Sequence, residues 1–178
     1  MSSALATDHL IVVGLNHKTA PLHIREQLAL QGESKAELIK TLKRRLSGGT
    51  MVVSTCNRVE FYGLSSTLSL GEEGLTDHQV LEMISDVVSE RCQIPIDELI
   101  KHFYIHRGDE ALHHIFRVAS SLDSLVIGEP QILGQLKEAL EESQSFETSG
   151  DLSILMERAF LVARRERNQT GISKHVVS

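Results

Sequence analysis

The sequence has no tryptophan, and its two tyrosines and five phenylalanines make up only 4% of 178 residues. So few aromatic rings disfavour a surface that stacks single-stranded bases. The two cysteines, Cys56 and Cys92, are too few for a disulfide framework or a zinc ribbon and indicate free thiols in a reducing compartment. Apolar runs are short, and no basic segment precedes one at the N-terminus, so we expect neither a membrane span nor a secretory signal.

Phosphate-binding and metal-binding motifs are also missing. No two of the 12 glycines are spaced Gly-x-Gly, which excludes the GxGxxG dinucleotide fingerprint, and GxxxxGK[ST] is absent. The nine histidines form no HExxH motif. His102 and His106, which we expect on one strand, would lie about 13 Å apart. We therefore expect no metal site and no dinucleotide site.

What is present is the composition of a globular chain, with 41% apolar residues, 24% charged residues and a net charge of −6. The charge is uneven: residues 1–64 carry 8 positive and 5 negative charges, whereas residues 65–100 carry 1 and 8. Two basic clusters are either contacts for a nucleic acid or solvated helix faces, and they comprise Lys40, Lys43, Arg44 and Arg45, and then Arg164, Arg165 and Arg167.

Hydrophobic periodicity predicts an α+β fold. The pattern indicates strands at 9–15, 50–54, 59–64 and 101–106, helices at 34–46 and 76–91, and a helical turn at 95–100. Capping boxes at Ser34/Glu37 and Thr76/Gln79 would begin the two longer helices. The order β-α-β-β-α-β is that of a ferredoxin-like βαββαβ sandwich. Further C-terminal helices are expected after Gly108, from Pro130 and from Gly150.

The residue with the clearest chemical potential is Cys56, in the predicted turn between two strands. A free cysteine is more often a small buried hydrophobic residue, and that alternative stays open here. Turn placement exposes the thiol, and the cationic neighbour Arg58 favours the thiolate, a nucleophile that forms thioesters. The Arg58 guanidinium either forks onto a substrate carboxylate or pairs with Glu60 at the surface. His113 or His114 could act as an acid, a base or a hydrogen-bond donor, and periodicity does not choose between them.

Three long blocks make the chain resemble glutamyl-tRNA reductase: 14–21 (GLNHKTAP), 54–60 (STCNRVE) and 122–135 (LDSLVIGEPQILGQ). The resemblance implies that Cys56 is the nucleophile that takes the glutamyl group as a thioester, and that Arg58 recognises the substrate carboxylate. It favours His114, with Ser124, as active-site residues. The remaining implied substrate contacts are Thr55, Asn57, Glu129 and Gln131, although Glu129 and Gln131 could instead support the pocket through hydrogen bonds. Ser121 departs from the glycine usual in the family.

The resemblance also implies a division of the chain and its partners. Residues 1–150 would form the N-terminal catalytic domain and residues 151–178 would begin the connecting helix, with the NADPH-binding and dimerisation domains absent. The family enzyme uses NADPH to reduce glutamyl-tRNA to glutamate 1-semialdehyde in tetrapyrrole synthesis. This chain alone is expected to bind no cofactor, to be monomeric, and only to deacylate glutamyl-tRNA in the cytoplasm, or the plastid stroma if it is from a plant. The alternative is a non-catalytic tRNA-binding or regulatory module with the same fold.

Overall fold

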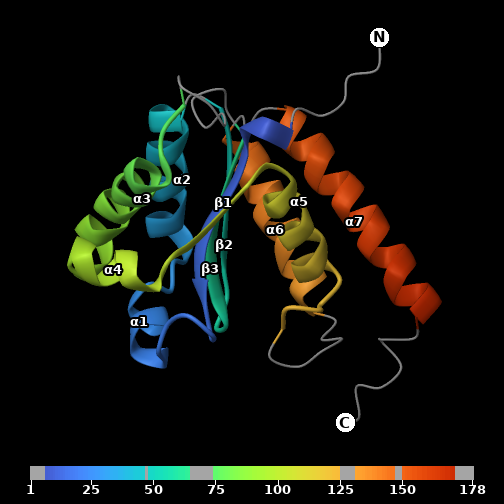
Figure 1. Ribbon diagram of the computed structural model, residues 1–178, viewed down its shortest axis with the longest axis horizontal. Coiled ribbons are helices and arrows are strands. Elements are labelled where there is room, and N and C mark those ends of the chain that lie inside the picture. Colours follow the sequence, from blue (N-terminus) through green and yellow to red (C-terminus); the bar gives the residue numbers. More distant parts are fainter. Residues whose placement is uncertain (1–6, 47, 65–73, 125–130, 147–149, 171–178) are drawn as a thin grey trace.

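The computed structural model describes residues 7–46, 48–64, 74–124, 131–146 and 150–170. Figure 1 shows three layers, with a β-sheet seen on edge between two groups of helices, α1 to α4 on one side and α5 to α7 on the other. The elements in chain order are η1 (Thr7–His9), β1 (Leu10–Asn16), α1 (Leu22–Gln27), α2 (Gly32–Leu46), β2 (Gly49–Ser54), β3 (Arg58–Leu64), α3 (Asp77–Cys92), α4 (Ile96–His102), β4 (Tyr104–Arg107), α5 (Gly108–Ala119), α6 (Gln131–Ser145) and α7 (Gly150–Thr170).

The four strands form one sheet in the order β2-β3-β1-β4, and each neighbouring pair is antiparallel. The short turn 55–57 joins β2 to β3, which confirms the predicted hairpin. Because β3 lies between β1 and β2, the chain passes from β1 through α1 and α2 and crosses over β3 before it enters β2. The predicted α+β class is therefore confirmed, with an antiparallel sheet at its centre.

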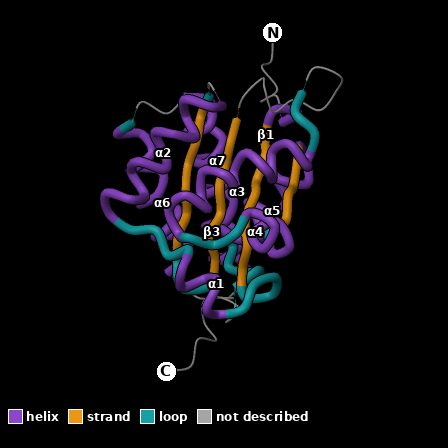
Figure 2. Tube along the Cα trace, turned by 90° about the vertical axis from the view of Figure 1, so that its left-hand side faces the viewer, coloured by secondary structure: helices purple, strands orange, loops and turns teal. Residues whose placement is uncertain are grey.

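Both faces of the sheet are buried, and each has its own hydrophobic core. Ile11, Val13 and Leu15 face the core under α1 to α4, whereas Leu10 and Val12 face the core under α5 to α7. This alternation follows from the two-residue period of side chains along a strand. In Figure 2 the strands run behind the helices of the first group. Two-sided burial explains why β1 is apolar at almost every position instead of alternating.

Two predicted helix starts had different outcomes. At α3 the capping box is confirmed, because Thr76 accepts from the Gln79 backbone and the Gln79 side chain accepts from the Thr76 N–H. At α2 the predicted box was wrong: the helix begins at Gly32, two residues before Ser34. Ser34 then lies inside the first turn, and its hydroxyl donates to the Gln31 carbonyl at 2.8 Å instead of capping an N–H.

The predicted strand at 101–106 was wrong at its start. Helix α4 continues through His102, and β4 covers only residues 104–107. Acidic residues in the first turn of α4 and Lys101 and His102 in its last turn complement the helix dipole and extend it. His102 and His106 therefore lie on different elements. The six-residue helix α1 was not predicted, because so short a segment shows no clear period.

The C-terminal helices are present as expected, with α6 beginning at Gln131 and α7 at Gly150. Pro130, expected at a first helical position, lies outside the described residues. Leu155, Met156 and Phe160 of α7 pack into the second core. Among the helices that the structure describes, none is long and apolar enough to cross a membrane.

Candidate functional site

Cys56 lies at the exposed tip of the β2–β3 hairpin, where the sequence places it. The turn is held by Thr55, whose hydroxyl accepts from the backbone N–H groups of Asn57 and Arg58, each at 3.2 Å. The Thr55 N–H in turn donates to the Arg58 carbonyl at 2.9 Å. A threonine that closes a turn on its own backbone fixes the loop without help from the core. Thr55 and Asn57 are both partly exposed beside the thiol.

The segment after β1 packs against this turn. The Asn16 side chain accepts from the Lys18 N–H at 2.8 Å, which turns the chain sharply, and the His17 N–H donates to the Asn57 carbonyl at 3.0 Å. Burial, with the charges of Lys18 and Arg58, lowers the pKa of His17. Within the described residues its buried Nδ1 has no hydrogen-bond partner. The His17 backbone thus packs against the Cys56 turn, and burial disfavours the charged form of its imidazole.

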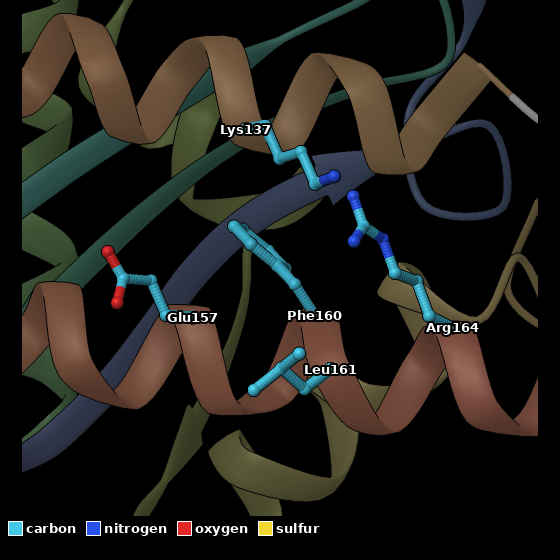
Figure 3. Close-up of a pocket in the computed structure, with 5 residues that line it drawn as sticks. All are labelled: Lys137, Glu157, Phe160, Leu161 and Arg164. Carbon is cyan, nitrogen blue, oxygen red and sulfur yellow. The ribbon is translucent and has the colours of Figure 1, made fainter.

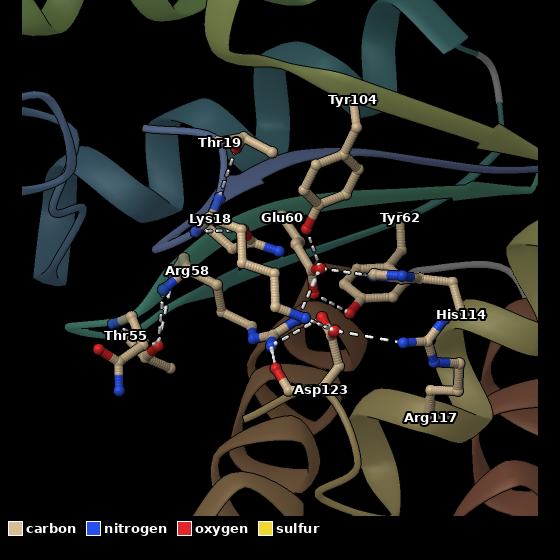
Figure 4. A network of polar contacts seen from close by, with 12 residues as sticks. Lys18, Thr19, Thr55, Arg58, Glu60, Tyr62, Tyr104, His114, Arg117 and Asp123 are labelled. Atoms are coloured by element: carbon tan, nitrogen blue, oxygen red, sulfur yellow. Dashed lines mark hydrogen bonds and ion pairs between the residues drawn. The ribbon is translucent and has the colours of Figure 1, made fainter. Parts of the chain in front are cut away.

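Arg58 points inward from the hairpin, not outward. It is only 2% exposed, and its guanidinium pairs with Glu60 at 3.0 Å and with Asp123 at 3.3 Å (Figure 4). Burial alone would lower the pKa of Arg58, but the neighbouring acidic groups, with Glu60 the strongest and Asp123 among them, together outweigh burial and raise the pKa. The expected pairing with Glu60 therefore exists, but the expectation that it lies on the surface was wrong. The alternation along β3 directs both side chains to the same buried face.

Glu60 is fully buried and is the centre of this network (Figure 4). One carboxylate oxygen accepts from Arg58, from His114 Nε2 at 2.6 Å and from the Tyr104 hydroxyl, and the other accepts from the Tyr62 hydroxyl. Burial alone would raise the pKa of Glu60. The His114 hydrogen bond and the Arg58 charge reverse this effect and lower the pKa to about 2. A buried carboxylate with four donors stays ionised and orients every group that donates to it.

Gly14 is opposite Glu60 in the β1–β3 pairing. A Cβ atom at Gly14 would lie 2.6 Å from the Glu60 Cγ and 2.8 Å from the Val59 carbonyl oxygen. The first residue of the 14–21 block is therefore a glycine because it leaves room for the buried carboxylate of the 54–60 block. Two sequence blocks that are far apart in the chain make one site.

His114 and His113 have opposite surroundings. His113 is exposed, whereas His114 is buried and its ring lies 4.7 Å from the ring of His106, centroid to centroid. The Tyr104 ring packs against the His106 and His114 rings, with centroid-to-centroid distances of 5.2 Å and 5.4 Å. Helix α5 carries His114 on the face that meets the sheet, which brings it to Glu60. The geometry therefore joins His114, and not His113, to the network.

Asp123 completes the network from the turn that follows α5. It binds Lys18 at 2.6 Å, and it lies 3.6 Å from the Arg117 guanidinium. Helix α5 ends in a Schellman motif, in which Leu122 donates to the Arg117 carbonyl and Ser121 adopts a positive φ of 61°. A glycine is normal at that position because it adopts a positive φ without strain, so Ser121, which departs from the family pattern, holds a strained backbone conformation there.

The other predicted contacts are less well connected. Ser124 is partly exposed on the same turn, and Gln131 is exposed at the start of α6. Glu129 lies outside the described residues. Cys92, at the end of α3, is half-buried, and burial raises the pKa of its thiol. Among the described residues, no group of three acidic, histidine or cysteine side chains could hold a metal ion.

Two clefts open near these elements. One of about 480 Å³ lies beside the hairpin tip and is lined by Cys56, Thr55, Arg25 and Gln135, among others. Arg25 donates to the Cys56 carbonyl at 2.7 Å. The other cleft, of about 260 Å³, lies between α6 and α7, and Lys137 and Arg164 extend into it from the two helices (Figure 3). Among the residues that the structure describes, the lining named for this second cleft includes Arg164 of the second basic cluster but no residue predicted for acyl transfer.

Sequence reasoning missed four charged residues of the site. Lys18 and Asp123 lie inside the 14–21 and 122–135 blocks without a predicted role, Glu60 is predicted only as a surface partner, and no sequence pattern predicts Arg25. A carboxylate in an otherwise apolar strand such as 59–64 is the signal that could have identified Glu60. No comparable signal marks Arg25, because nothing in the sequence brings α1 to the hairpin tip.

The chain is similar to known proteins of one family. The family model described as "Glutamyl-tRNAGlu reductase, N-terminal domain" matches residues 13–170. Glutamyl-tRNA reductase from Thermodesulfovibrio yellowstonii is 42% identical, over 95% of this chain and 39% of its own. The same enzyme from Syntrophotalea carbinolica is 40% identical, over 96% and 37%. The solved glutamyl-tRNA reductase from Methanopyrus kandleri superposes with a TM-score of 0.74 at 28% identity, over 96% of this chain and 37% of its own. The chain thus spans less than half the length of these relatives.

Proposed function

Since the chain belongs to the glutamyl-tRNA reductase family as its N-terminal domain, we propose that it carries out the acyl-transfer step of that enzyme's reaction. The observation that carries the proposal is the position of an exposed cysteine at the tip of a rigid hairpin. This cysteine lines a cleft, and a buried network of charged side chains lies behind it. Rigid elements that hold a nucleophile at a cleft are what acyl transfer requires.

In the proposed step the Cys56 sulfur attacks the ester carbonyl carbon of glutamyl-tRNA. A carbon–sulfur bond forms and the carbon–oxygen bond to the terminal ribose breaks. The thiol proton passes, overall, to the departing ribose hydroxyl. The products are a glutamyl thioester on Cys56 and uncharged tRNA, with no oxidant or reductant needed.

Arg58 is proposed to recognise the side-chain carboxylate of the glutamyl group. Two carboxylates already occupy its guanidinium, and they differ in how firmly they are held. Glu60 accepts from four donors and is fully buried, whereas Asp123 is also paired with Lys18, a side chain that is 55% exposed. We propose that the substrate carboxylate takes the place of Asp123, which Lys18 and Arg117 can retain at the rim. The bidentate geometry of Arg suits this exchange.

His114 is proposed as a positioning residue that acts through Glu60. Thr55 and Asn57 would hold the thiol in place through the turn, and Ser124, Glu129 and Gln131 would line the substrate path. The strand order β2-β3-β1-β4, with helices on the crossovers, supports the finer fold assignment that we propose, a ferredoxin-like sandwich with added C-terminal helices. We also propose residues 1–150 as the catalytic domain and 151–178 as the start of a connecting helix.

NADPH would supply the hydride that converts the thioester to glutamate 1-semialdehyde in the full reaction. The described residues do not fit that cofactor, because every strand pairing among them is antiparallel and none forms a β-α-β unit with adjacent parallel strands. The reduction is therefore not assigned to these residues.

The tRNA is proposed to approach from the end of the sheet that carries the hairpin tip. Figure 1 places the end of α7 toward this end of the molecule and the end of α2 at the other. Arg164 and Arg165 are exposed on α7, whereas in α2 Arg45 pairs with Asp86 and Lys40 pairs with Glu37. Of the two basic clusters in the sequence, we therefore favour the second as the contact for tRNA phosphates.

Trapping of the thioester tests the proposed function. The chain is mixed with glutamyl-tRNA labelled in the glutamate, and label on the protein that hydroxylamine removes is measured. We expect label on the wild type and on Cys92→Ser, the matched control, and none on Cys56→Ser. Equal label on Cys56→Ser would refute the role of Cys56. Tight tRNA binding with no label on the wild type would favour the alternative, a non-catalytic module whose Arg58 stays committed to Glu60 and Asp123.

A further inference from the structure

The cleft beside Cys56 is larger than the proposed acyl-transfer step needs. Its volume of about 480 Å³ lies within the range of sites that enclose whole small molecules. The glutamyl group is much smaller, and Arg58, which is proposed to hold its carboxylate, is not among the residues that line the cleft. The cleft therefore has room for a second part of the substrate. Its lining includes Leu22, Arg25, Gln31, Thr55, Cys56 and Gln135.

Arg25 supplies the positive charge of this cleft. Its Nη1 donates to the Cys56 carbonyl at 2.7 Å and its Nε donates to the Ala20 carbonyl at 3.3 Å. Both acceptors are neutral, and within the described ranges no carboxylate forms an ion pair with Arg25, whereas Arg58 has two. A guanidinium has five N–H donors, so several remain for a ligand. Glu26, on the exposed side of α1, is the one carboxylate among the lining residues named for this cleft.

The chemistry of the ester fixes what must lie next to the thiol. The reacting carbonyl carbon is bonded to the ribose of the terminal nucleotide, so this nucleotide adjoins Sγ whatever pocket holds the glutamyl group. A phosphodiester precedes that ribose, and arginine is the side chain best suited to bind it. Leu22, which is 56% exposed, offers apolar surface to a base. Gln31 and Gln135 carry amides that can pair with the edge of a base.

Resting on the proposed function, we propose that this cleft is the subsite for the 3′-terminal nucleotide of the acylated tRNA, with Arg25 bound to the phosphate that precedes it. Arg25 then has two tasks: it ties α1 to the carbonyl of the nucleophile, and it anchors the end of the tRNA. Both tasks place the ester over Sγ. The subsite thereby separates recognition of the nucleic acid, at Arg25, from recognition of the amino acid, at Arg58.

The test compares two acyl donors on Arg25→Ala. One is glutamyl-tRNA, and the other is a thiobenzyl ester of glutamate, which has no nucleotide. We expect KM for glutamyl-tRNA to rise about tenfold or more with kcat retained, as for the loss of a hydrogen bond to a charged group. The slope of log KM against log salt should fall by about one. Thioester formation from the small ester should fall much less than thioester formation from glutamyl-tRNA, because only the contact between Arg25 and the Cys56 carbonyl is lost there. Arg25→Lys should recover part of the affinity because it restores the charge without the fork.

A binding measurement separates this proposal from the proposed function. An unacylated acceptor-stem minihelix is titrated against Cys56→Ser, with and without Arg25→Ala, so that no thiol chemistry is required. Loss of affinity with Arg25→Ala supports the subsite even if no thioester forms. Arg158→Ala, an exposed arginine on α7 that lines neither cleft, is the matched control and should bind normally. Unchanged minihelix affinity overturns the proposal. An equal loss with both acyl donors also overturns it, because Arg25 would then only position the Cys56 backbone.

Discussion

Replacement of Glu60 by glutamine is the most informative perturbation of the buried network. Glu60 accepts from Arg58, Tyr62, Tyr104 and His114, and its side chain is inaccessible to solvent. Glutamine keeps the shape of the side chain but removes its charge and replaces one acceptor oxygen by an NH₂ donor. At least one of the four donors then faces another donor, and Arg58 loses its principal buried counter-ion.

The expected loss of stability can be worked out in two ways. Removal of one partner from a buried ion pair typically costs about 3–5 kcal/mol. The pKa of Glu60, about 2 compared with an ordinary 4.5, corresponds to about 3 kcal/mol in favour of the ionised form. Both routes give a large share of the roughly 5–15 kcal/mol that stabilises a domain. With a urea dependence of about 2 kcal/mol per molar, the unfolding midpoint of Glu60→Gln should fall by about 2 M.

The assay has a local probe as well as a global one. The sequence has no tryptophan and only two tyrosines, Tyr62 and Tyr104, and both donate to Glu60. Near-ultraviolet circular dichroism of the tyrosines therefore reports the network, and far-ultraviolet circular dichroism reports the whole fold. Urea titrations of the wild type and Glu60→Gln, followed at both wavelengths, should show the tyrosine signal already changed in the folded state of the variant.

Acid titration tests the direction in which pH changes the contribution of Glu60 to stability. The folded pKa of Glu60 is depressed, so its contribution is complete above the ordinary value of 4.5 and is lost as pH falls through about 2. The difference in stability between the wild type and Glu60→Gln should therefore shrink between about pH 4.5 and pH 2. Glu98→Gln, a change of the same kind at a side chain of α4 that is 42% exposed, is the control and should shift the midpoint little. A Glu60→Gln midpoint equal to that of Glu98→Gln would refute the reasoning.

Three further predictions concern the framework of the site. Burial and the neighbouring Glu60 charge raise the pKa values of Tyr62 and Tyr104. An absorbance titration should therefore show no tyrosinate around the ordinary pKa of 10 while the chain stays folded. Ionisation of either ring at that pH would contradict the network. Gly14→Ala should destabilise the chain by about 3 kcal/mol in urea, because the added methyl meets Glu60 and the β3 backbone, and an unchanged midpoint would argue against this close approach. Thr76→Ala should cost about 1 kcal/mol through the lost N-cap, with Arg58 and its network unaffected; a changed tyrosine signal would indicate coupling that the fold does not predict.

The local patterns that sequence reasoning identified correctly depend on neighbours along the chain. The hairpin around Cys56 follows from two largely apolar segments and the short turn 55–57 between them, and the start of α3 follows from the Thr76 and Gln79 pair. Errors occurred where local signals were ambiguous. Ser34 had the spacing of a cap without being one, and residues 101 and 102 continued a helix although they resembled a strand.

The site residues also divide into those that local sequence determines and those that contacts between distant segments determine. Sequence alone determined that Cys56 lies in an exposed turn, because turns and their polar residues are set by local backbone preferences. Only the tertiary structure decided that Arg58 is buried and paired, since its partner Asp123 is 65 positions away and lies on the Schellman turn after α5. The choice of His114 over His113 likewise required the contact of α5 with the sheet. Charges become buried or exposed through packing between distant segments, and no local pattern encodes that packing.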